Sequence, residues 1–168
     1  MSAGRALKRA SAAIVVLATF AVTSERIRDP DRSQAIAMGT IRFVTAGEVS
    51  YSSANFGYFD TPECLASRSC IPGVRLVGTW FPTEIARSRE TGGYIFRFHA
   101  GPPAPHDDAA QWSPSSITRF AIVATPIPSA TQSRRSFCSD DRQLIYVTID
   151  AVPRVENGRC LDVDNPLR

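Results

Sequence analysis

The residues of this chain whose types and spacing could do chemistry are two histidines and two carboxylates. His99 ends a strand-like segment, and His106, Asp107 and Asp108 follow it in a proline-containing loop. Imidazole and carboxylate groups could together bind a metal ion or share a proton as general acid and base. Charged loop residues are usually only solvated, and a spacing without a scaffold is a weak motif. We therefore assign no catalytic, cofactor-binding or metal-binding residue. A small secreted enzyme or metal-binding protein that uses these four residues is the alternative.

Three other carboxylates have simpler structural interpretations. Asp140 and Asp141 stand where a turn is expected, and aspartate favours turns because its side chain bonds to nearby backbone. Glu48 could be a buried functional carboxylate, but an ion pair with Arg42 or another arginine at the edge of an apolar stripe is the simpler interpretation. The sequence contains no nucleophile elbow, phosphate-binding loop or dinucleotide fingerprint. We expect a protein that is not an enzyme.

One amphipathic helix, predicted over residues 33 to 53, organises the rest of the chain. At about 100° per residue, its apolar side chains gather in one arc. The members of this arc are Ile36, Ala37, Ile41, Phe43, Val44 and Tyr51. Asp31 can cap the start of the helix with Gln34 three residues later, and Asn55 or Gly57 can close its end. A helix with one apolar arc needs a partner surface.

The second half of the chain predicts short β-strands that can supply this surface. Tyr94–His99 and Ile117–Thr125 are rich in aromatic and β-branched residues, which favour strands. Arg135–Ser139 and Gln143–Thr148 fit a hairpin. The segment Val74–Arg89 is ambiguous between a strand and helical turns. The order of elements predicts an α+β fold, in which a long N-terminal α-helix packs across a small antiparallel β-sheet with disulfide-stapled loops.

The four cysteines, an even number, predict two disulfides in an exported chain. Of the three possible pairings, we favour Cys64–Cys70 and Cys138–Cys160. The first closes a short loop, and the second ties the C-terminal tail to a strand, which contributes on the order of 3 kcal/mol. No Cys-x-x-Cys pair is present, and the histidines are not spaced to complete a zinc site with the cysteines. Four free buried thiols are the alternative.

Residues 1 to 24 are expected to be an export signal. Three basic residues precede an apolar run, Ala10–Val22, whose 13 residues would span about 20 Å as a helix. That length falls short of the roughly 30 Å hydrocarbon core of a bilayer, so a signal peptide fits better than a short membrane anchor, which is the alternative. Residues 25 to 168 are the expected globular domain. It is exported and is periplasmic, extracellular or anchored at the inner membrane of a bacterium.

The charge balance argues against a nucleic-acid partner. The formal net charge is +3, but three of the 19 basic residues lie in the N-terminal segment. The remaining 16 basic residues face 16 acidic ones. Affinity for nucleic acids comes largely from neutralised phosphates, which a neutral domain does not supply. We expect protein partners, and membrane contact only through residues 10–22 if the signal is not cut.

Several pieces of the sequence together resemble the globular part of type IV pilins and type II secretion pseudopilins. In order, they are AIAMGTIRFVTAGEVSYSS (35–53), FGYFDTPECL (56–65), the Gly-Gly-Tyr strand and FAIVATPIPSATQSRRSFCSDDRQLIYV (120–147). The resemblance implies a pilin-like fold, with a long helix across an antiparallel sheet, and a C-terminal disulfide loop like Cys138–Cys160 is common in pilins. It also implies a non-enzymatic structural or interaction protein, an accessory (minor) component of a type IV pilus or type II secretion-like system, with pilus or secretion-system subunits as partners.

The N-terminus departs from the pattern of this family. Pilins carry a Gly-Phe site for the prepilin peptidase, then about 20 apolar residues with a glutamate at the fifth position. Here basic residues occupy that region, the apolar run contains no glutamate, and Pro30 with charged neighbours is expected to interrupt the helix. We therefore predict that the chain does not build a filament by itself, although it can join or cap one.

Overall fold

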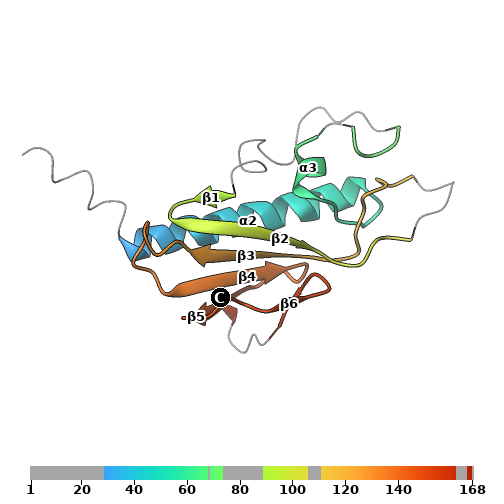
Figure 1. Cartoon of the computed structure of the whole chain (residues 1–168). Helices are drawn as coiled ribbons and strands as arrows, with labels where there is room; N and C mark the ends of the chain where they lie inside the picture. Colours follow the sequence, from blue (N-terminus) through green and yellow to red (C-terminus); the bar gives the residue numbers. More distant parts are fainter. Residues whose placement is uncertain (1–28, 68, 74–88, 106–110, 162–165, 168) are drawn as a thin grey trace, which may run out of the picture.

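The structure is a computed structural model of the whole chain, and it describes residues 29–67, 69–73, 89–105, 111–161 and 166–167. Within these ranges, helix α2 lies along one face of an antiparallel sheet (Figure 1). The predicted α+β fold, with one helix packed on an antiparallel sheet and two disulfides, is therefore confirmed.

Two predictions concern segments outside the described residues. The first is the export signal expected at residues 1–24. The second is the segment Val74–Arg89, of which the structure describes only Arg89. Among the residues that the structure describes, no helix is both long enough and apolar enough to cross a membrane.

Helix α2 runs from Pro30 to Ala54 and so begins three residues before the predicted start. Asp29, rather than Asp31, caps it, because the Asp29 side chain accepts hydrogen bonds from the backbone N–H groups of the next turn. Pro30 occupies the first turn, where its missing N–H has no helical acceptor to lose. Because Asp29 has an extended backbone, the helix does not continue into it, which agrees with the interruption expected at Pro30. At the other end Asn55 is the C-cap, as predicted.

The buried face of α2 is rotated relative to the predicted arc. Its buried residues are Ser33, Ala37, Ile41, Val44, Thr45, Gly47, Glu48 and Tyr51. Ile36 and Phe43 are instead 38% and 45% exposed. Ile36 lies at the side of the helix against Gly92, where an added Cβ would come within 2.5 Å of the Ile36 side chain. Four residues of the predicted arc, Ala37, Ile41, Val44 and Tyr51, are therefore buried. The sheet covers them and leaves Ile36 and Phe43, on one side of the arc, largely exposed.

Six strands form one antiparallel sheet in the order β1-β2-β3-β4-β5-β8. Their bounds are Glu90–Thr91, Tyr94–Ala100, Phe120–Pro126, Arg135–Asp140, Ile145–Ile149 and Pro166–Leu167. Strands β1 to β5 are neighbours both in sequence and in the sheet, so they form a meander, and β8 pairs with β5 after the chain has passed through two other strands. A second, two-stranded sheet pairs β6 (Val155–Glu156) with β7 (Arg159–Cys160).

The predicted strands agree with the observed ones to within a few residues, and the start of β3 differs most. The expected strand began at Ile117, whereas β3 begins at Phe120. Ile117 instead forms isolated bridges with Phe59 and Pro103. These bridges bring the loop that follows α2 against the loop that follows β2, and both loops lie at the same end of the sheet.

The sheet separates two hydrophobic clusters, because successive side chains of a strand point to opposite faces. Between α2 and the sheet lie Ala37, Ile41, Val44, Tyr51, Leu65, Ile71, Tyr94, Phe96, Ile122, Ala124, Phe137 and Ile145. On the other face lie Ala121, Val123, Cys138, Tyr146 and Cys160. Strand β4 contributes Phe137 to the first cluster and Cys138 to the second, so its disulfide to Cys160 holds β7 against the face that the helix does not cover.

Both predicted disulfides, Cys64–Cys70 and Cys138–Cys160, are present, and no cysteine is free. Disulfides persist in oxidising compartments and are rare in the cytosol. The pairings therefore indicate an exported, non-cytoplasmic protein.

Candidate functional site

Of the four residues that could do acid–base or metal chemistry, only His99 lies in the described part of the chain. It stands on β2 opposite Ala121 of β3 and is half-buried. Burial, with Arg97 nearby, lowers the pKa of His99. His106, Asp107 and Asp108 lie outside the described residues. Within the described ranges, no three His, Cys, Asp or Glu side chains are grouped so that they could hold a metal ion.

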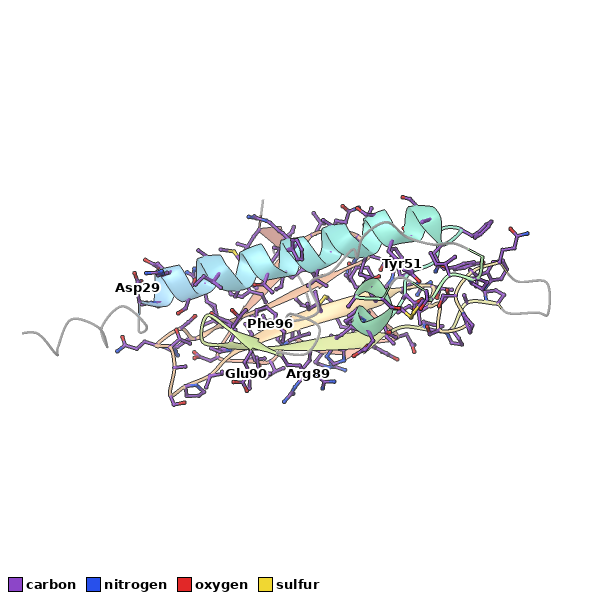
Figure 2. The ribbon with its side chains drawn as sticks, turned by 90° about the horizontal axis from the view of Figure 1, so that it is seen from above. Asp29, Tyr51, Arg89, Glu90 and Phe96 are labelled. Carbon is purple, nitrogen blue, oxygen red and sulfur yellow. A yellow bond between two sulfur atoms is a disulfide. The ribbon has the colours of Figure 1, made fainter. Side chains whose placement is uncertain are left out.

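Polar side chains, all of them buried except that of Ser115, gather instead where α2 ends. Glu48, Tyr51 and Asn55 come from the helix end, Asp60 from the loop before α3 (Pro62–Leu65), and Ser113, Ser115 and Ser116 from the loop before β3. We call these seven residues the polar cluster. Figure 2 shows Tyr51 toward the end of α2 that lies opposite Asp29. Glu48, Asn55 and Asp60 are completely buried.

Asp60 is the acceptor at the centre of the polar cluster. Its carboxylate accepts hydrogen bonds from the Tyr51 hydroxyl at 2.9 Å, the Ser115 hydroxyl at 2.7 Å and the Thr61 backbone N–H at 2.8 Å. Three donors suit an ionised carboxylate, because they replace the hydration that burial removes. Burial, followed by the bond to Asp60, raises the pKa of Tyr51, so its hydroxyl remains a donor.

Glu48 lacks comparable partners. Its Oε2 accepts one long bond, 3.3 Å, from the backbone N–H of Asp60, and its Oε1 is buried without a described hydrogen-bond partner. Burial raises the pKa of Glu48 well above its usual range; the backbone bond opposes this shift and the charge of Asp60 adds to it. Glu48 therefore stays protonated over part of the pH range in which an exposed glutamate is ionised.

Asn55 joins the two loops of the polar cluster through its side-chain amide. The amide nitrogen donates to the Tyr58 carbonyl at 3.0 Å and to the Ser116 hydroxyl at 2.8 Å. The amide oxygen accepts from the Ser113 backbone N–H at 2.8 Å. Because all three bonds are buried or partly buried, they fix the loop after α2 relative to the loop before β3.

In the loops that Asn55 joins, two aromatic side chains lie near the ring of Trp112. The rings of Phe56 and Tyr58 lie 6.3 Å and 5.1 Å from that of Trp112. Phe56 is 57% exposed and has a φ of 56°, a left-handed conformation that costs a non-glycine residue about 1–2 kcal/mol. Phe56 is thus a strained and exposed aromatic residue in a loop that buried hydrogen bonds hold in place, which is a common feature of protein interaction sites.

A second buried carboxylate fixes the C-terminal disulfide loop. Asp140 is completely buried and accepts hydrogen bonds from the Arg142 guanidinium at 2.6 Å and from the Cys160 backbone N–H at 3.1 Å. The Arg142 guanidinium also lies 5.2 Å from the centre of the Tyr146 ring. The turn predicted at Asp140 and Asp141 is confirmed, since Asp140 accepts from the Arg142 backbone N–H and the turn joins β4 to β5.

No family model matches the chain, and neither a curated protein nor a solved structure matches it. Within the described residues, the bonds of the polar cluster and of Asp140 connect protein segments to one another. The arrangement thus fixes two loop surfaces, one at the end of α2 and one at the C-terminal disulfide.

Sequence reasoning placed Glu48 wrongly. An ion pair with Arg42 or another arginine was expected, but Arg42 is exposed on another side of the helix, and no ion pair of the described residues includes Glu48. Glu48 follows Val44 by four residues and precedes Tyr51 by three, which is the spacing of the buried face. That spacing was the signal that could have revealed a buried carboxyl. The described partner of Glu48, the backbone N–H of Asp60, has no comparable signal in the sequence.

Proposed function

We propose that this chain is a non-enzymatic, exported, pilin-like structural or interaction protein, an accessory component of a type IV pilus or type II secretion-like system. The observation that carries the proposal is the path of α2. This single helix of 25 residues lies along an antiparallel meander, and a disulfide closes the C-terminal loop beside the last strands. That combination is the one that the sequence resemblance implies.

The two ends of α2 suit a subunit that is attached to an assembly at the start of the helix and exposes a binding surface at the end of the helix. Figure 2 places Asp29 at one end of the described molecule, and any segment before Asp29 joins it there. The polar cluster and the exposed Phe56 lie toward the opposite end. A subunit held through its N-terminal segment would therefore present the loops around Phe56 away from the attachment point.

The charges around the start of α2 favour an accessory subunit over a self-assembling one. The charged residues here are Arg26, Arg28, Asp29, Asp31 and Arg32. Of these, Asp29, Asp31 and Arg32 lie in the described part of the chain and are exposed. Burying such charges in a filament core costs several kcal/mol per ion unless each is paired, which dispersion contacts do not offset.

Expression of the full-length chain in an exporting host without other pilin genes tests this proposal. After shearing and sedimentation of the surface fraction, we expect soluble or membrane-retained protein and no fibres of this subunit. A self-assembling major pilin, expressed in the same host with its own assembly machinery, is the positive control. Abundant fibres made only of this chain would refute the accessory role.

A further inference from the structure

The loop after α2 is held to the helix by two buried carboxyl groups that share no cation. Neither Glu48 nor Asp60 takes part in the ion pairs that the described residues form at Arg134–Asp150, Arg142–Asp140 and Arg159–Asp141. Helix α2 presents Glu48 and the Tyr51 hydroxyl to Asp60, and the loop before β3 presents the uncharged hydroxyl of Ser115. Glu63, the other acidic residue of the segment, is exposed.

We propose that Glu48 is a pH-sensitive latch for residues 58–65. While the Glu48 carboxyl is protonated, the segment stays closed on α2 through the bond from the Asp60 N–H and through the bonds that Asp60 accepts from Tyr51 and Ser115. When the proton leaves for solvent, two negative charges lie side by side in a buried site to which no described residue contributes a cation. Opening of the segment returns both charges to water, which relieves the repulsion and the desolvation.

The direction of the switch follows from the two states of Glu48. In the closed state burial raises the pKa of Glu48, and in the open state the carboxyl returns toward its ordinary value of about 4.3. Between these two values the closed state holds one more proton than the open state. The equilibrium constant for opening therefore rises about tenfold per pH unit in this window and levels off above the raised pKa.

Hydrogen exchange of the full-length exported protein from about pH 5 to about pH 8 measures this constant, once the base-catalysed intrinsic rate is divided out. The reporters are the amides of Leu65 and Ala66, which donate to the carbonyls of Thr61 and Pro62. We expect the opening constant of the wild type to rise about tenfold per pH unit within the window. It should stay flat in Glu48→Gln, while Glu63→Gln, at an exposed site in the same segment, should follow the wild type.

Equal pH dependence in the wild type and Glu48→Gln would overturn the latch. So would an equal rise at Leu65 and at the core amides of β3, because exchange would then report global unfolding instead of local opening. If Glu48→Gln does not fold, a carbon-13 carboxyl titration of the wild type decides. A Glu48 resonance that titrates near the ordinary value contradicts the proposal, and one that titrates well above it supports the proposal. None of these outcomes depends on the pilin-like assignment.

Discussion

Replacing Val44 by aspartate is expected to lower the free energy of unfolding by roughly 3–5 kcal/mol. Val44 is 2% exposed and lies in the hydrophobic cluster between α2 and the sheet. A carboxylate at this position would be buried among apolar side chains, and neither water nor a cation would balance its charge. Since small domains are stable by only about 5–15 kcal/mol, much of the population would unfold.

Denaturant unfolding of Val44→Asp beside Ala46→Asp measures this effect. Ala46 lies two residues further along the same helix and is exposed. The control should lose less than about 1 kcal/mol, mainly from the lower helix propensity of aspartate. Wild-type stability in Val44→Asp would show that this face of α2 does not pack on the sheet.

Replacing Asp140 by alanine is expected to cost a similar amount, roughly 3–5 kcal/mol. The substitution removes a completely buried carboxylate, so the buried Cys160 backbone N–H loses its acceptor and the partly exposed Arg142 guanidinium keeps only its bond to the Cys160 carbonyl. A buried donor that loses its partner contributes its full desolvation penalty. The C-terminal disulfide would remain, but the loop that it closes would lose its anchor on β4.

A matched control is Arg134→Ala, which breaks the ion pair between Arg134 and Asp150 and leaves Asp150, whose φ of 56° disfavours alanine, unchanged. That pair is exposed, with 73% and 48% of its side chains accessible, so its loss should change stability by less than about 1 kcal/mol. Chemical denaturation of the two variants measures the loss in free energy of unfolding for each, and we expect the larger loss for the buried Asp140. Equal losses would mean that Asp140 does not anchor the C-terminal loop.

The elements of this fold are largely predictable from sequence because they follow local periodicity. The helix, the strand after Gly92-Gly93 and the hairpin of β4 and β5 each repeat a pattern within a few residues, so their existence follows from their own segments. Boundaries shift where a distant contact competes. Ile117 leaves β3 because it bridges to Phe59, a residue far away in sequence.

The candidate site is predictable only in part, because its bonds cross between distant segments. Asn55 was one of two residues, with Gly57, that were expected to close the helix, and it is the C-cap. Its bond to Ser116, 61 residues away, could not be inferred from either segment alone. The burial of Glu48 was readable from its spacing, but its partner is a backbone N–H of Asp60. Backbone groups are present at every residue, so sequence does not single out such a partner.

The accessory role is tested most directly by the composition of surface filaments or secretion complexes in the organism that encodes this chain. After shearing and affinity purification of the assemblies, quantitative mass spectrometry measures the ratio of this chain to the main subunit. We expect this chain in the assemblies as a small fraction, together with a different and far more abundant subunit. Its absence from every such assembly, or its presence as the main subunit, would contradict the account.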